Sequence, residues 1–252
     1  MINMMKADVQ RIFRGEGIYY TMGALILFII MHVSGQSNVG DTTLRNTGIN
    51  MPFYLMQITS NVIFAIIPTV IFIGADDFST GAVKNVLTSG TSRIQYYASK
   101  LILSFLFCIF LFGLHILGGT IIVTIIRGFG GTFDMDFVIS VLKPFLAQLF
   151  LLLAVASVGM FFVFVTRKTS DVTGWFVAFI MAPSPLIVQL LAPINERFIN
   201  LLDFELVTMI AQLSSFTELS TGDITRILLT GAAYILISTI AGIMLFRKCE
   251  IK

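Results

Sequence analysis

Residues able to form ion pairs gather in one stretch of an otherwise apolar chain. The stretch 73–100 reads IGADDFSTGAVKNVLTSGTSRIQYYASK and lies between two apolar segments. It holds the adjacent carboxylates of Asp76 and Asp77 and the basic side chains of Lys84, Arg93 and Lys100. A hydrophobic chain that spaces charges in this way presents them to an aqueous partner. These residues predict that the stretch forms ion pairs with a separate cytoplasmic subunit that docks on it.

Motifs for catalysis and for metal binding are missing from the sequence. It contains no GxxxxGK[ST] run that would cradle a phosphate, no HExxH and no cluster of Cys and His. The two histidines, His32 and His115, are far apart, and no Ser–His–carboxylate set accompanies them. We therefore expect no catalytic residue, no metal site and no cofactor bound by this chain.

Composition indicates which solvent surrounds the protein. Hydrophobic residues make up 56% of the 252 residues, charged residues only 12%, and the mean hydropathy is +0.92. Soluble domains carry roughly 25% charged residues, so this chain could not cover a surface in water and most of its surroundings must be lipid. The net charge of +2 is too small to indicate a nucleic-acid partner. Cys108 and Cys249 form no disulfide framework.

The length of the apolar segments predicts an all-α polytopic membrane protein. Six segments lack Asp, Glu, Lys and Arg, and about 20 such residues cross a bilayer as a helix. We expect one transmembrane domain over 1–252, with spans at about 18–33, 53–75, 101–126, 145–166, 172–193 and 227–246.

Two further segments are expected to lie along the membrane surface. Residues 1–15 place apolar and charged side chains at helical spacing, which predicts an N-terminal helix in the interface. On this reading Ile2, Met5, Val9 and Ile12 face the membrane, and Lys6, Asp8, Arg11 and Arg14 face elsewhere. The external segment 194–225, between spans five and six, predicts one or two short helices, either as a lid over an exit pathway or as an interfacial connector.

The distribution of basic residues predicts the orientation. Eleven of the 16 Lys and Arg residues fall on one side of the predicted spans and five on the other. Cytoplasmic loops carry the excess of basic residues. Both termini and the loop 76–100 are therefore expected in the cytoplasm.

Mild polar groups and prolines mark a candidate pathway through the membrane. The spans carry no charge, which argues against a carrier driven by ions or protons, because such carriers keep ionisable groups at depth. Proline removes a backbone hydrogen bond from a helix. The freed carbonyl group is tolerated in a membrane only where neighbouring protein or a water-filled cavity supplies another partner. The candidates are Gln57, Asn61, His115, Pro183 and Pro185. Their alternative roles are hydrogen bonds between helices and simple kinks.

The loop also resembles the first cytoplasmic loop of type-2 ABC exporter permeases. The resemblance rests on an acidic position, a small turn followed by Lys, then Leu, then Ser-Arg, and a Lys that opens the third span. Asp replaces the commoner Glu, and the turn residues are reordered. These positions are Asp76, Asp77, Phe78, Ser79, Thr80, Gly81, Lys84, Leu87, Ser92, Arg93 and Lys100.

The resemblance implies a function and partners. It implies a permease subunit in a bacterial cytoplasmic membrane, with ATP and Mg bound by a separate ABC ATPase and with a second permease completing a homo- or heterodimer. The chain is similar to compact permeases that export antimicrobial or toxic peptides or that give lantibiotic self-protection. The alternatives are a membrane peptide sensor or immunity protein that binds without transport, and an uncoupled channel or scramblase.

The loop itself predicts a short helix that could act as a lever. We expect it over 78–87, with Asp76 and Asp77 at its positive N-terminal end and Thr88, Ser89 and Gly90 ending it. Movement of an ATPase bound to this helix would tilt it and reshape the outer opening. Lys84 and Arg93 are expected either to pair with acidic groups of the partner or to serve as ordinary basic anchors.

Overall fold

The computed structural model describes residues 2–35, 47–181, 193, 204–213 and 219–249. Within these ranges every regular element is a helix, as the apolar spans predict. In chain order the elements are α1 (Ile2–Arg14), α2 (Glu16–Gly35), α3 (Met51–Gln57), α4 (Ser60–Val70), η2 (Ile71–Ala75), α5 (Asp76–Ser79), α6 (Ala82–Thr88), α7 (Arg93–Gly113), η3 (Leu114–Gly118), α8 (Gly119–Arg127), α9 (Met135–Thr166), α10 (Thr169–Met181), α12 (Leu206–Leu213) and α13 (Thr221–Lys248).

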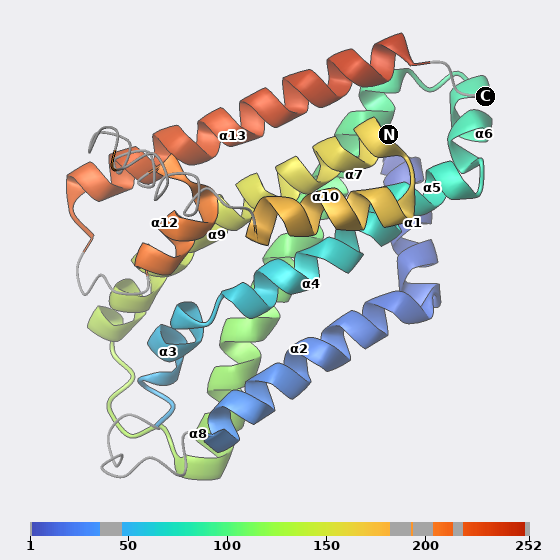
Figure 1. The fold of residues 1–252 in the computed structure, drawn as a ribbon. Coiled ribbons are helices and arrows are strands. Elements are labelled where there is room, and N and C mark those ends of the chain that lie inside the picture. The colour runs from blue at the N-terminus through green and yellow to red at the C-terminus, as the bar shows by residue number, and fades with distance from the viewer. Residues whose placement is uncertain (1, 36–46, 182–192, 194–203, 214–218, 250–252) are drawn as a thin grey trace.

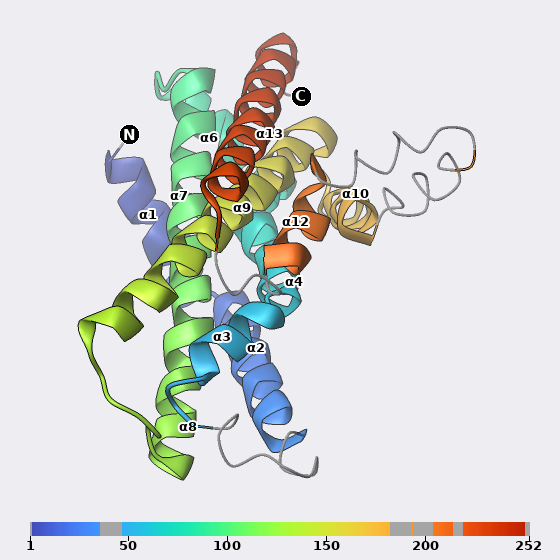
Figure 2. The same ribbon diagram turned by 90° about the vertical axis from the view of Figure 1, so that its left-hand side faces the viewer.

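The long helix α9 lies at the centre of the bundle. It contacts α13, α7, α10, α4 and α12, while α2 and α13 lie on opposite outer sides (Figure 1). The start of α1, the end of α13 and α6 lie at one end of the bundle, and the connection between α8 and α9 lies at the other (Figures 1 and 2). We call the first of these the α6 end. Helices that start and finish at the same end agree with an even number of spans.

In the part of the chain that the structure describes, five helical segments are long and apolar enough to cross a membrane, which confirms a polytopic all-α protein. They are Glu16–Ser34, Ser60–Ser79, Arg93–Arg127, Met135–Thr166 and Thr221–Lys248. Their outward-facing apolar side chains are exposed, as expected for helices that lipid surrounds. The remaining predicted span, 172–193, begins within α10, and apart from residue 193 its part beyond residue 181 lies outside the described residues.

The second span differs from the uninterrupted segment 53–75 that hydropathy predicts. It is broken after α3, begins again at Ser60 and continues through η2 and α5 to Ser79. Polar contacts hold the break: the Thr59 hydroxyl donates to the Met56 carbonyl at 2.7 Å and to Gln148 Oε1 at 3.0 Å. Gln148, on α9, donates in turn to the Met56 carbonyl at 2.9 Å. These bonds satisfy the backbone where the helix stops.

Two segments of wider π-helix interrupt the second and third spans. In the second span, Pro68 lies inside α4 and removes one backbone donor, and η2 follows three residues later. In the third span, η3 carries His115. Such π-helical turns are frequent at functional sites in helices. Here η2 leads directly into the two aspartates.

Helix α1 packs against protein on the face that carries Asp8. Asp8 and Ile12 are buried, and the Phe13 ring lies 5.7 Å from the Phe107 ring of α7. The prediction that Asp8 faces away from the apolar side is therefore wrong, because the carboxylate has a buried basic partner. Lys6 and Arg14 are exposed as predicted.

The external segment contains one short helix among its described residues. In α12 the side chains of Leu206, Met209, Ile210 and Leu213 are buried, and the helix contacts α9. This confirms a short helix in the segment and shows it packed into the bundle. Outside α12, the segment 194–225 that is predicted to be external is described only at 204–205 and 219–225.

The start of α7 is fixed by a capping box. The Ser92 hydroxyl accepts from the Gln95 amide at 3.2 Å, and Gln95 Oε1 accepts from the Ser92 amide at 3.3 Å. Replacing Ser92 with alanine is expected to lower the free energy of unfolding by about 1 kcal/mol. The Gln95 amide would lose its acceptor, and the reciprocal bond from the Ser92 amide to Gln95 would be weakened. Thermal unfolding in detergent measures this. Ser92→Asp should retain most of the stability, and an alanine variant as stable as wild type would contradict the assignment.

Candidate functional site

Four buried side chains and the exposed Arg11 form an ionic cluster at the α6 end: Asp8, Arg11, Asp77, Tyr96 and Lys100. Lys100 Nζ lies 2.7 Å from Asp8 Oδ2 and 2.6 Å from Asp77 Oδ2. Arg11 forms an ion pair with Asp77 and lies 3.4 Å from Asp8 Oδ1. The Tyr96 hydroxyl donates to Asp77 Oδ2 at 2.6 Å. Two acids and two bases thus balance each other. We call this group the ionic cluster.

Three separate parts of the chain supply the ionic cluster. Asp8 and Arg11 come from α1, Asp77 from α5, and Tyr96 and Lys100 from the first two turns of α7. Spacings of three and four residues place each helix's pair on one face. The exposed fractions are 0% for Lys100, 2% for Asp77 and 8% for Asp8. The cluster therefore ties α1 and the segment after the second span to the third span.

The charges of the ionic cluster hold one another in place. Partial burial lowers the pKa of Arg11, but its hydrogen bond to Asp77 and the nearby carboxylates of Asp77 and Asp8 outweigh this and raise the pKa above its usual value. The guanidinium therefore stays charged. Removing one member of a buried ionic group is strongly destabilising because it leaves an opposite charge without a partner.

An aromatic cluster lies beside the ionic cluster and extends to two more helices. The Phe164 ring of α9 is centred 5.5 Å from Phe78, 4.5 Å from Tyr97 and 4.8 Å from Phe246. Tyr96 belongs to both clusters, with its ring 6.0 Å from Phe164 and 6.0 Å from Phe246. Edge-to-face pairs at these separations stabilise the packing of rings. The segment containing Phe78 is thereby packed against α7, α9 and α13.

The segment between the second and third spans consists of two short helices instead of one. Gly81 separates α5 from α6 with a backbone φ of 72°, which a residue with a side chain rarely adopts. The helix predicted over 78–87 is thus wrong at its start. Asp76 and Asp77 follow η2 without a break, so they do not occupy a free helix N-terminus. The predicted end is confirmed, since α6 stops at Thr88 and Gly90 has a φ of 94°.

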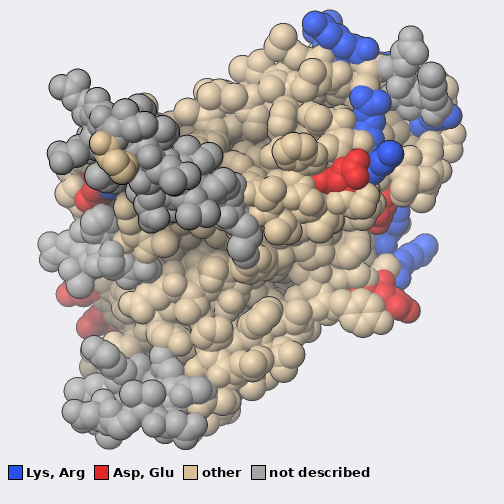
Figure 3. Space-filling view, viewed as in Figure 1, with Lys and Arg blue, Asp and Glu red and all other residues tan. Residues whose placement is uncertain are grey.

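Helix α6 packs one face against the protein and exposes the other. Val83 is buried, and Val86 and Leu87 are partly buried against the core. Lys84, Asn85 and Thr88 are exposed, and positions 84 and 88 share a face. Figure 3 shows Lys and Arg side chains gathered at this end of the molecule. The exposed face of α6 is free to contact another protein.

Arg93 has a different environment from the one that its sequence position predicts. Its Nη1 donates to the carbonyls of Phe246, Arg247 and Cys249 at 2.7, 2.9 and 2.6 Å. Its guanidinium also lies 5.7 Å from the centre of the Phe246 ring. Arg93 is therefore engaged within the chain, where its Nη1 binds the last turn of α13.

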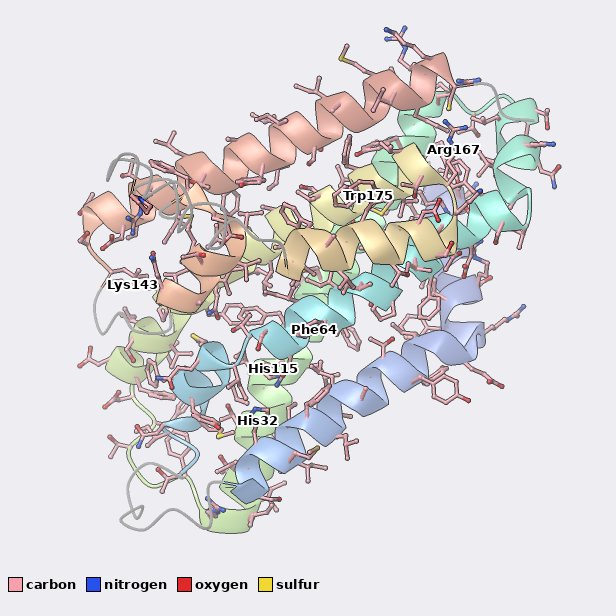
Figure 4. The ribbon with its side chains drawn as sticks, in the orientation of Figure 1. His32, Phe64, His115, Lys143, Arg167 and Trp175 are labelled. Atoms are coloured by element: carbon pink, nitrogen blue, oxygen red, sulfur yellow. The ribbon has the colours of Figure 1, made fainter. Side chains whose placement is uncertain are left out.

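Three of the five candidate pathway residues lie in the part of the chain that the structure describes: Gln57, Asn61 and His115. Gln57 is exposed, and Asn61 is half-buried one turn further along the second span. His115 lies on η3, which contacts α2 and α3 (Figure 4), and its Nε2 is 3.1 Å from the Leu55 carbonyl. This bond matches the structural alternative for His115. Pro183 and Pro185 lie outside the described residues.

The arrangement holds helices together and contains no catalytic set. Among the described residues no group of three or more His, Cys, Asp and Glu side chains could hold a metal ion. The carboxylates of the ionic cluster are already satisfied by basic partners and a hydroxyl. What the site can do is to transmit the position of α5 and α6 to the spans around them.

Residues 5–184 match the family described as ABC-2 family transporter protein. The chain belongs to the ABC-2 transporter family. No curated protein matches it. The matched residues run from α1 through α10 and include every member of the ionic cluster, both short helices and Arg93.

Membership of the ABC-2 family agrees with the architecture. A protein of this family is the membrane component of an ABC transporter, a transport subunit and not itself an enzyme, and it works with an ABC ATPase and usually another permease. A multi-pass bundle of apolar helices with a short exposed helix at one end suits that role.

Sequence reasoning did not assign Asp8, Arg11 or Tyr96 to the site of this ABC-2 permease, and it placed Lys100 in the docking stretch without its buried partners. A signal was present for two of them. Asp8 lies three to four residues from Met4, Met5 and Ile12, on the side of the helix that packs inward, and Lys100 directly precedes the apolar run of the third span. An acid and a base at the inward edges of two membrane helices indicate a buried ion pair.

Proposed function

We propose that this ABC-2 permease is the membrane subunit of an ATP-driven exporter and that α6 is the helix on which its ATPase docks. The observation that supports this best is the contrast between the two parts of the segment 76–93. Asp77, Phe78 and Arg93 are held by contacts inside the bundle, whereas Lys84, Asn85 and Thr88 are exposed on α6. An exposed helix on a rigidly held base can transmit movement.

The proposed cycle uses this rigidity. When the ATPase pair closes on nucleotide, α6 moves with it, and the ionic and aromatic clusters carry the movement to α1, α7, α9 and α13. A packed bundle responds to such a displacement by changing between discrete arrangements. Two permease chains with two ATPase chains, each ATPase holding ATP and Mg, would open the outer side of a bacterial cytoplasmic membrane. The α6 end, rich in Lys and Arg, is the cytoplasmic end in this proposal.

The proposed cargo is an amphipathic or hydrophobic molecule such as a peptide. The spans contain mild polar groups, including the hydrogen-bonded Ser157 and Ser238 of α9 and α13 at 2.9 Å. Among the described residues of these spans, the buried Lys100 is neutralised within the ionic cluster at the α6 end. Spans whose buried charges are paired in this way suit the passage of an apolar surface better than that of a small ion. The second candidate is a sensor or immunity protein that binds a peptide without moving it.

The docking proposal predicts that Lys84→Glu weakens binding of the ATPase. Reversing an exposed charge at the centre of an interface should reduce the amount of ATPase that co-purifies with the permease by about tenfold, or 1.4 kcal/mol. The measurement is recovery of the ATP-binding partner with the tagged permease in mild detergent.

The matched control for this experiment is Lys168→Glu, which reverses an exposed lysine in the short link between α9 and α10 at the same end of the bundle. Equal loss of ATPase from both variants would contradict docking on α6. Asp77→Ala is unsuitable, because it removes a buried charge. If resistance of the host to a toxic peptide survives when the ATPase is inactive, the sensor function is supported in place of export.

A further inference from the structure

The last turn of α13 is bound by a residue far away in the chain. The final carbonyl groups of a helix have no partner within the helix, and they form its negative end. In α13 the carbonyls of Phe246, Arg247 and Cys249 all accept hydrogen bonds from Arg93, at 2.6–2.9 Å. A fixed positive group therefore caps this helix from outside.

The same residue lies at the base of the docking helix. Arg93 is the first residue of α7, and only the residues 89–92 separate it from the end of α6. The capping box of Ser92 and Gln95 fixes the backbone immediately beside it. Movement of α6 therefore reaches Arg93 through a short and well-ordered connection.

Phe246 is contacted from both sides of the docking helix. Arg93, which follows α6, lies over its ring, and the Phe78 ring, which precedes α6, is 6.2 Å away at nearly a right angle. Phe246 itself is buried. Because both ends of the docking segment meet the same residue of α13, a displacement of the segment acts directly on the last turn of that helix.

The rest of α13 is packed closely against α9 and α7. Neighbouring side chains lie directly over two of its glycines: a methyl group added at Gly231 would lie 2.6 Å from the Phe150 ring of α9, and one at Gly242 would lie 2.5 Å from the Tyr97 hydroxyl of α7. Ser238 donates to Ser157 across the same contact. These contacts couple the position of α13 to α7 and α9 along its length.

We propose that Arg93 is the positioning residue that makes α13 follow the docking segment, so that ATPase movement reaches the last span through the helix terminus that Arg93 caps. This rests on the proposed function. All three carbonyls lie within hydrogen-bond distance of one nitrogen, Nη1, while the guanidinium lies over the Phe246 ring. A planar guanidinium can donate and stack on an aromatic ring at once, whereas a lysine ammonium on a flexible stem holds a less fixed geometry.

The test measures the distance between α6 and α13 with and without Arg93. Spin labels are placed at Thr88→Cys and Lys248→Cys, both exposed positions, in a Cys249→Ser background. Cys249 contributes its carbonyl and not its thiol to the cap. In the permease alone, in lipid nanodiscs, Arg93→Ala should broaden the distance distribution about twofold, because the cap no longer fixes the two helices. Arg93→Lys should give an intermediate width, and the control Arg247→Ala should match wild type.

A second measurement distinguishes transmission of movement from α6 to α13 from simple stabilisation of the end of α13 by Arg93. With the co-purified ATPase, addition of ATP and Mg should leave the distance between positions 88 and 248 unchanged when Arg93 is present, because α13 follows α6. In Arg93→Ala the same addition should shift the distance while the ATPase remains bound. If Arg93→Ala behaves as wild type in both measurements, the inference is overturned. If no ATPase co-purifies with the wild-type permease, the proposed function fails, and the width of the distribution in the permease alone still decides the role of Arg93 as a cap.

Discussion

Replacing Lys100 with methionine is expected to lower the free energy of unfolding by about 3–5 kcal/mol. The two side chains are similar in size, so the change removes the charge and leaves little empty space. Lys100 is fully buried and is the group that Asp8 and Asp77 share. Without it two buried carboxylates face Arg11 alone. Thermal or chemical unfolding of the purified permease in detergent measures the loss.

A double-mutant cycle shows whether the loss comes from charge balance. Asp8→Asn alone leaves an excess of positive charge in the ionic cluster, and Lys100→Met alone leaves an excess of negative charge. The combined variant keeps the balanced pair of Arg11 and Asp77, so its loss of stability should be smaller than the sum of the single losses by about 0.5–3 kcal/mol. Lys84→Met is the matched control and should be close to neutral, because Lys84 is exposed. Strict additivity would contradict the cluster.

Truncating Phe164 to alanine should cost up to about 3–5 kcal/mol of stability. The side chain is fully buried, and its ring contacts Phe78, Tyr97 and Phe246, which come from three different helices. The cavity left by the ring would loosen the packing of the docking segment as well as of the bundle. We therefore expect lower thermal stability together with weaker recovery of the ATPase.

The comparison for this prediction is Phe110→Ala on α7. The Phe110 side chain is 42% exposed on the outside of the bundle, and lipid is as apolar as the core, so its removal loses far less packing. A Phe164→Ala variant no less stable than Phe110→Ala would show that the aromatic cluster does not hold the α6 end together.

Hydropathy predicted most of the fold because the requirement for a membrane helix is met by consecutive residues. A membrane helix needs about 20 apolar residues wherever it lies, and the predicted spans 145–166 and 227–246 fall inside α9 and α13. The break after α3 escaped this reasoning. The polar residues around Thr59 were assigned to a pathway, whereas Thr59 bonds to the backbone and to Gln148 where the helix stops.

The candidate site could be predicted only in part, because many of its contacts join residues that are distant in the sequence. The docking segment is contiguous, so its charges and its end at Gly90 could be recognised from sequence. The partners of those charges are not local: Asp8 meets Lys100 from 92 residues away, and Arg93 meets Phe246 from 153 residues away. A single sequence does not indicate which distant helix supplies a partner. Basic residues at the edge of a membrane therefore look like anchors until the packing is known.

The wide separation of the ionic cluster along the chain has a consequence for biogenesis. Asp8 and Lys100 can pair only after the first two spans and the start of the third have left the ribosome. Until then α1, made first, has only its amphipathic surface to hold it at the membrane. Closure of the cluster therefore marks the moment at which the N-terminal half has inserted correctly. A nascent chain that places its third span wrongly keeps unpaired charges at the bilayer edge, where quality-control proteases can recognise it.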